Sequence, residues 1–169
     1  MTRFVIIADT HDNLPLIEAV VAASNERDAD YVLHCGDYVS PFTANAFKGL
    51  KAEFIGVFGN NDGDRPALLK AYKEIGFIHS DPHRVKIGDS SVLVTHKPDI
   101  AEDAAAMGGY DLVAYGHEHA VHVKRGLTLL VCPGEVGGWV SGRSTMAVVD
   151  MPEHDVEIVE IGPTGGGNR

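Results

Sequence analysis

The stretch Arg3-Phe-Val-Ile-Ile-Ala-Asp-Thr-His11 joins a short β-branched apolar run to a polar end. Continuous apolar runs of this length are typical of strands that are buried on both faces, as in a largely parallel sheet. Such a strand would deliver Asp9 and His11 to its carboxyl end. The opening of the chain therefore predicts a buried strand that presents two polar side chains at one edge of a sheet.

The same order, an apolar run and then a polar cluster, recurs along the chain. Strand-like runs at 31–35, 53–58, 91–95 and 111–115 lead respectively into Gly36-Asp37, Gly59-Asn60-Asn61-Asp62, His96, and Gly116-His117-Glu118-His119. Helical patterns are expected from about 13 to 27, from 43 to 50 and from 100 to 107. This alternation predicts βαβ units with right-handed crossovers and a parallel sheet.

The second half of the chain carries fewer helix signals. Residues 84–87 and 91–95 flank Gly88-Asp89-Ser90, a short connection that predicts a hairpin. The remaining strand-like runs, 127–132, 144–149 and 156–161, are expected to form a second, partly antiparallel sheet. The predicted fold class is α/β, a two-sheet β-sandwich flanked by helices. It forms one domain over residues 1–161, and the Gly-rich end, 162–169, is expected to be a mobile tail.

Charge, apolar run length and cysteine context limit the kinds of partner and location that are expected. A formal charge of −10 argues against a broad nucleic-acid surface or an anionic-membrane surface, because such partners are bound by clustered Lys and Arg. No apolar run approaches the ~20 residues of a membrane span, so a cytoplasmic location is the default expectation. Cys35 and Cys132 lie inside apolar runs without a Cys-x-x-Cys partner, and both are interpreted as buried thiols.

The polar clusters form a coherent set of metal ligands. Ligand sites in α/β sheets lie beyond the carboxyl ends of strands, so these clusters would converge on one crevice. Each motif alone is weak, but together in chain order they are a strong signal. The oxygen and nitrogen donors suit Mn, Fe, Ni, Co or Zn, and they divide between two ions ~3.5–4 Å apart, as in phosphatases and nucleases. The expected metal ligands are Asp9, His11, Asp37, Asn60, His96, His117 and His119.

From Phe4 to about Val149, the order of these motifs resembles the calcineurin-like metallophosphoesterase superfamily, in particular its small single-domain YfcE-type phosphodiesterase branch. The resemblance implies α/β/β/α layers and two divalent metal ions. Mn and Ni are the metals expected ahead of Fe, Co and Zn. It assigns Asp9, His11, Asp37 and His119 to one ion, and Asp37, Asn60, His96 and His117 to the other. A hydroxide that bridges the ions would attack the phosphorus of a small phosphodiester directly.

The resemblance also suggests catalytic and substrate-binding residues. Asn60, His96 and Asp62 are the expected catalytic residues, with Asp62 either orienting a ligand or, less favoured, donating a proton. Asn61 is a candidate for substrate contact. Independently of the resemblance, Arg65 and Lys97 are candidates because guanidinium and ammonium groups suit phosphoryl oxygens, with solvated surface cations as the equal alternative. Many relatives carry His at the place of Asn61, Gly at that of Lys97, and Ser at that of Glu135. Since an amide cannot be a general acid, Asn61 leaves the source of the leaving-group proton open.

Other functions remain as alternatives. The same fold serves as a protein-interaction scaffold in the retromer complex, where metal ligands are partly lost, whereas the ligand set here is complete. A phosphomonoesterase or a dinucleoside-polyphosphate hydrolase would share the metals and differ in pocket shape. Trp139 lies among small residues and is expected to line the pocket or a subunit interface, in keeping with a homodimer or homotetramer. His122, close to His117 and His119 in sequence, is expected to be structural.

Overall fold

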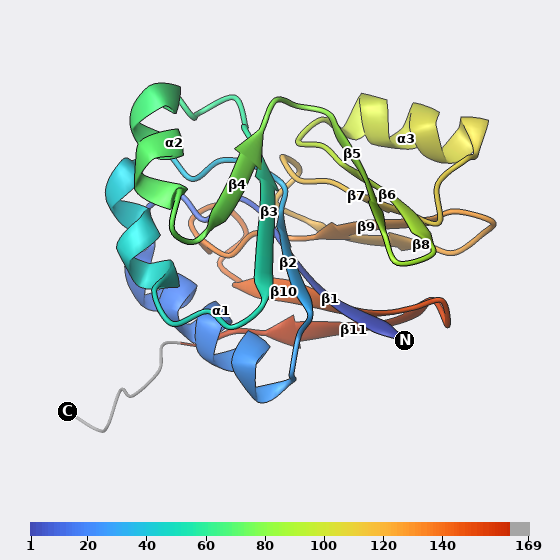
Figure 1. Cartoon of the computed structure of the whole chain (residues 1–169), viewed down its shortest axis with the longest axis horizontal. Coiled ribbons are helices and arrows are strands. Elements are labelled where there is room, and N and C mark those ends of the chain that lie inside the picture. The colour runs from blue at the N-terminus through green and yellow to red at the C-terminus, as the bar shows by residue number, and fades with distance from the viewer. Residues whose placement is uncertain (163–169) are drawn as a thin grey trace.

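A computed structural model describes residues 1–162, and residues 163–169, which hold most of the predicted mobile tail, lie outside the described part (Figure 1). The first sheet has the strand order β11-β10-β1-β2-β3-β4. Its parallel part confirms the sequence prediction, and it consists of β1 (Thr2–Ile7), β2 (Tyr31–His34), β3 (Glu53–Val57) and β4 (Gly76–His79). The antiparallel strands β10 (Thr145–Met151) and β11 (Asp155–Glu160) complete it beyond β1.

The second sheet has the order β5-β6-β7-β9-β8. The predicted hairpin is present as β5 (His83–Ile87) and β6 (Ser90–Val94). β6, β7 (Leu112–Ala114) and β9 (Leu129–Pro133) run parallel, and β8 (Val121–Lys124) pairs antiparallel with β9. The carboxyl ends of β6 and β7 therefore lead into His96 and His117, as expected.

Helices cover both outer faces, which confirms the α/β/β/α layers (Figure 1). The helices α1 (Leu14–Glu26), η1 (Pro41–Phe47) and α2 (Arg65–Tyr72) lie on the first sheet, and α3 (Pro98–Met107) lies on the second. Side chains of β1 alternate between two cores, because successive residues of a strand point to opposite faces. Val5 and Ile7 pack toward the helices, whereas Phe4 and Ile6 pack between the sheets.

Some sequence predictions are wrong in detail. The strands predicted at 144–149 and 156–161 belong to the first sheet as β10 and β11, because β10 pairs with β1 rather than with β9. Residues 41–47 form a 3-10 helix, not the predicted helix over 43–50. The elements α2, β4 and β8 were not predicted at all. They are short or largely exposed, so their sequences carry little apolar periodicity.

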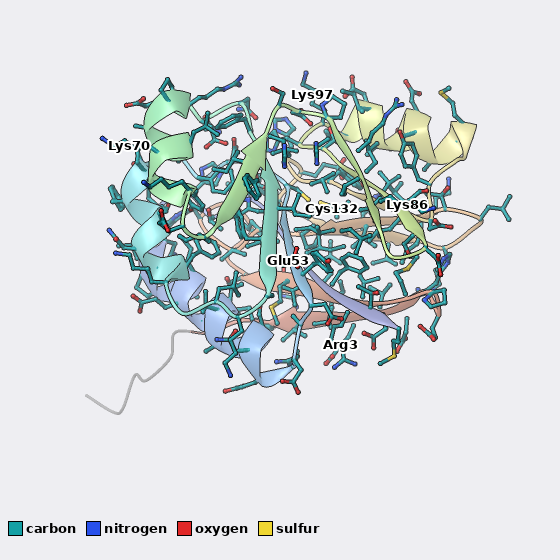
Figure 2. All side chains as sticks on the ribbon, viewed as in Figure 1. Arg3, Glu53, Lys70, Lys86, Lys97 and Cys132 are labelled. Carbon is teal, nitrogen blue, oxygen red and sulfur yellow. The ribbon has the colours of Figure 1, made fainter. Side chains whose placement is uncertain are left out.

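Cys35 and Cys132 are both buried and free, in agreement with the sequence interpretation. Within residues 1–162, no helix has the length and apolar character needed to cross a membrane. Arg3, at the start of β1, pairs with Asp150 of β10 at 2.8 Å. Figure 2 shows Arg3 at the bottom of the view and Lys97 at the top. Lys97 directly follows His96, at the carboxyl end of β6.

Candidate metal centre

The predicted ligands come together at the carboxyl ends of strands from both sheets. Asp9 and His11 follow β1, Asp37 follows β2 and Asn60 follows β3 in the first sheet. From the second sheet, His96 follows β6, and His117 and His119 follow β7. Because the two sheets face each other, these loops meet at one edge of the sandwich, and residues more than a hundred positions apart in sequence lie side by side.

The backbone turns sharply at most of these ligands. Asp9, His11, Asp37, His117 and His119 have φ between 40° and 76°, a left-handed conformation that is uncommon for residues other than glycine. Such strained conformations persist where surrounding contacts hold them, and they gather at functional sites. The turns direct the ligand side chains back over the strand ends.

Glycines allow the ligand loops to approach one another closely. A Cβ atom on Gly59 would lie 2.1 Å from Oδ1 of Asp37, and one on Gly36 would lie 2.8 Å from Nδ1 of His96. Any other residue would displace a neighbouring ligand. This close packing is the physical reason for glycine immediately before Asp37 and Asn60.

One group of potential metal-binding atoms is formed by Asp9, His11 and His119. Oδ1 of Asp9 lies 3.8 Å from Nε2 of His11 and 3.6 Å from Nε2 of His119. Both Oδ1 of Asp9 and Nε2 of His11 are buried, and neither has a hydrogen-bond partner. Buried polar atoms without partners are costly and rare, so their convergence fits a cation held between them.

A second group contains Asp9, Asp37 and His96. Oδ2 of Asp37 lies 3.5 Å from Nε2 of His11 and 3.6 Å from Nε2 of His96, so this carboxylate lies between the two groups. Oδ1 of Asn60 is 2.7 Å from Nε2 of His96 and 3.0 Å from Nδ1 of His117. All the predicted ligands are thus brought together, and Asp37 lies where a bridging ligand is expected.

The electrostatics of the site favour cations. Asp9 and Asp37 are almost fully buried, with relative exposures of 0% and 1%. Burial raises the pKa of Asp9 to about 7, although the neighbouring His119 opposes this rise. Burial lowers the pKa of His11, which keeps its imidazole neutral and able to donate a lone pair. Oxygen and neutral nitrogen donors of this kind fit first-row divalent ions.

Hydrogen bonds to the backbone fix the ligand loops and the ligand side chains in place. Asp62 is 3% exposed, and its carboxylate accepts hydrogen bonds from the backbone N–H groups of Asp37, Val39 and Gly59. These contacts favour the orienting role for Asp62, because its oxygens face backbone donors. Nδ1 of His96 lies 2.8 Å from the carbonyl oxygen of Cys35, which directs Nε2 toward the second group.

Two supporting carboxylates were not predicted as site residues. Asp81 accepts hydrogen bonds from the hydroxyl of Thr95 at 2.6 Å and from the backbone N–H of His96 at 3.0 Å. Glu135 contacts Nδ1 of His119 at 2.9 Å. Asp81 carries no motif in the sequence. The only signal for Glu135 is its position beside Pro133-Gly134, where many relatives carry Ser.

The substrate-binding candidates lie in different surroundings. Arg65 and Lys97 line a cavity of about 500 Å³ that also borders Asn60, His96 and His117. The guanidinium carbon of Arg65 lies 4.9 Å from the ring centroid of Phe58, a cation–π contact. Asn61 is outside this lining, and its backbone and side-chain N–H groups donate to the Asp37 carboxylate at 2.9 and 2.7 Å.

Two residues near the site have surface positions. Trp139 is 68% exposed, and its indole N–H donates to the carbonyl oxygen of His11 at 3.1 Å. His122 lies in β8, and its Nδ1 is 3.2 Å from the hydroxyl of Tyr115, outside both groups of ligand atoms. Trp139 therefore borders the candidate site, whereas His122 does not.

Comparisons with known proteins identify the family of this chain. The chain matches the calcineurin-like phosphoesterase superfamily domain over residues 2–154. It is 37% identical over 155 residues to the phosphodiesterase MJ0936 of Methanocaldococcus jannaschii, covering 89% of this chain and 93% of that protein. Its structure is similar to that of an archaeal phosphodiesterase, with a TM-score of 0.88, 33% identity, and coverage of 94% of this chain and 99% of that one. The phosphoesterase YfcE from E. coli shares the fold, with a TM-score of 0.67, 18% identity, and coverage of 95% and 100%.

Proposed function

The chain belongs to the calcineurin-like phosphoesterase superfamily and is a metal-dependent phosphoesterase, and we propose that it hydrolyses small phosphodiesters. The observation that carries the proposal is the pair of buried, unpartnered ligand atoms, Oδ1 of Asp9 and Nε2 of His11, which face Nε2 of His119 and the Asp37 carboxylate. The relatives of highest identity reported above are described as phosphodiesterases, which supports a diester rather than a monoester substrate.

Two divalent ions are proposed to bind, with Asp37 shared between them. Asp9, His11 and His119 would hold the first ion, and Asn60, His96 and His117 the second. Asp37 reaches a histidine of each set at 3.5 and 3.6 Å, which supports the bridging role. The four histidine nitrogens favour Mn²⁺ or Ni²⁺ over Mg²⁺, since Mg²⁺ prefers oxygen ligands and water. Fe, Co and Zn ions are also compatible with this donor set.

When bound, such ions activate water for attack on phosphorus and polarise the phosphoryl oxygens. Asn60 and His96 act in this proposal by holding the second ion, and Asp62 acts by orienting the loop of Asp37. Arg65 and Lys97 would contact the phosphoryl oxygens from the cavity that they line, because cationic side chains pair strongly with phosphate. Their positive charge would also offset the acidic character of the chain, whose net charge is −10.

A substrate screen separates this proposal from its alternatives. The Mn²⁺-loaded protein is expected to cleave aryl and nucleotide diesters faster than matched monoesters or dinucleoside polyphosphates. Faster cleavage of monoesters, or of dinucleoside polyphosphates, would replace the diesterase assignment with that activity. A non-catalytic scaffold would turn over none of these compounds. The complete ligand set supports the enzyme over the scaffold.

A second prediction concerns Asn61, whose amide cannot protonate a departing oxygen. A positioned general acid contributes ~10²–10⁴-fold, and poor leaving groups need it most. The parent enzyme is therefore expected to depend steeply on leaving-group pKa. Asn61→His should flatten that dependence, with the greatest gain for alkyl esters. The measurement is kcat/KM for diesters of graded leaving-group pKa.

The matched control is Asn45→His, in the exposed part of η1. This control should reproduce the steep dependence of the parent, and both variants should keep the metal content of the parent. If plots for the parent and Asn61→His run parallel, then residue 61 does not serve the leaving group. Loss of metal in Asn61→His would instead show that the contact of Asn61 with Asp37 supports the bridging carboxylate.

A further inference from the structure

The loop between β9 and β10, residues 134–144, contacts every member of the first ligand group. The backbone N–H of Gly137 donates to the carbonyl oxygen of Asp9 at 2.9 Å, and the indole N–H of Trp139 donates to that of His11 at 3.1 Å. The third contact joins Nδ1 of His119 to Oε2 of Glu135 at 2.9 Å. This loop thus contacts Asp9, His11 and His119, the three residues that would bind the first ion together with the shared Asp37.

Glu135 is the member of this loop that reaches a ligand side chain. It is fully buried, and its second oxygen, Oε1, accepts hydrogen bonds from the backbone N–H groups of Val140 and Ser141. One carboxylate oxygen therefore accepts hydrogen bonds from the backbone of its own loop, and the other contacts Nδ1 of His119.

The carboxylate oxygen 2.9 Å from Nδ1 determines which nitrogen of His119 carries the proton. It accepts a hydrogen bond, so the neutral imidazole carries its proton on Nδ1 and leaves the lone pair of Nε2 free. Nε2 is the atom that lies 3.6 Å from the unpartnered Oδ1 of Asp9. In the second group, the corresponding contact of His96 is to the carbonyl oxygen of Cys35 and does not involve this loop.

We propose that Glu135 is a positioning residue that holds His119 in its metal-binding tautomer and orientation, and that it thereby sets the affinity of the first ion independently of the second. This inference rests on the proposed two-metal function. It also makes Trp139, the only tryptophan of the chain, a reporter for the first ion, because its indole is bonded to the backbone of His11.

The test is a titration of the metal-free protein with MnCl₂, followed by calorimetry and by Trp139 fluorescence, which bound paramagnetic Mn²⁺ should quench. The variant is Glu135→Gln, which keeps an oxygen for Val140 and Ser141. Its amide would present N–H donors to Nδ1 of His119 and favour the wrong tautomer. The matched control is Glu118→Gln, because exposed Glu118 lies beside His119 in sequence but accepts only from the hydroxyl of Tyr115 among residues 1–162.

In the parent and in Glu118→Gln, two binding steps are expected, and the stronger quenching should accompany the ion bound by His11, because the Trp139 indole is bonded to the His11 backbone. In Glu135→Gln, the Mn²⁺ affinity of the step with the stronger quenching should fall by ~10–100-fold. The affinity of the other step and the melting temperature of the metal-free protein should stay unchanged. Parent-like binding of both ions, or weakening of both steps with a lower melting temperature or failure to fold, would overturn the positioning role. A parent protein that binds no Mn²⁺ would instead overturn the proposed function itself, before any variant is compared.

Discussion

Removal of divalent ions by a chelator will abolish phosphodiester hydrolysis, and added Mn²⁺ or Ni²⁺ will restore it better than Mg²⁺. The expected loss is about 10³-fold or more, because bound ions contribute several kcal/mol of transition-state stabilisation, and each 1.36 kcal/mol changes the rate about tenfold. The order of the metals follows from the histidine nitrogens at 11, 96, 117 and 119, which suit Mn²⁺ and Ni²⁺ better than Mg²⁺. The measurement is the hydrolysis rate before chelation, after it and after each metal is added back.

The fold is expected to survive chelation, since the buried clusters between the layers are built from apolar side chains that do not bind the ions. Added metal should also restore activity less well as the pH falls below about 7. The pKa of Asp9 is raised to about 7, so below this pH an entering ion must displace a proton from the Asp9 carboxyl group. The control is the melting temperature and far-UV circular dichroism of the chelated protein. Full activity after exhaustive metal removal, with metal content verified, would refute the metal mechanism.

Asp37→Ala will lose metal and activity together. Asp37 is 1% exposed, and its Oδ2 lies 3.5 Å from His11 and 3.6 Å from His96, so its removal takes an anionic ligand from both ions at once. A fall of at least about 10³-fold in kcat/KM is expected, similar to that after chelation. Elemental analysis of the purified variant and a rate assay with excess Mn²⁺ are the two measurements.

Two controls accompany this variant. Asp89→Ala removes an exposed aspartate from the turn between β5 and β6, and it should leave both metal content and rate unchanged. His122→Ala removes a histidine that contacts the Tyr115 hydroxyl and lies outside the candidate site, and it should also spare both metal content and rate. If Asp37→Ala retained two ions per chain, the bridging assignment would be wrong, even if its activity were lost.

The sequence alone predicted the buried strands and the ligand residues at their ends, because both leave a local pattern along the chain. An apolar run such as 4–8, followed by Asp9, identifies a buried strand and the residue at its end, because burial on both faces needs a continuous apolar segment. Glycine before Asp37 and Asn60 could be read in the same way, and the structure supplies the reason, since a Cβ on Gly36 or Gly59 would collide with a ligand. The family resemblance and the fold class followed from the order of these motifs.

Only the tertiary structure decided which strands pair and which polar groups support the ligands. The run at 144–149 is apolar enough for either sheet, and only the tertiary structure shows that it pairs with β1 in the first sheet. Asp81 and Glu135 contact His96 and His119 across long chain separations, and such contacts leave no periodicity or spacing in the sequence. Local propensity fixes where a strand ends, whereas the partners of a side chain depend on packing of segments that are remote in the chain.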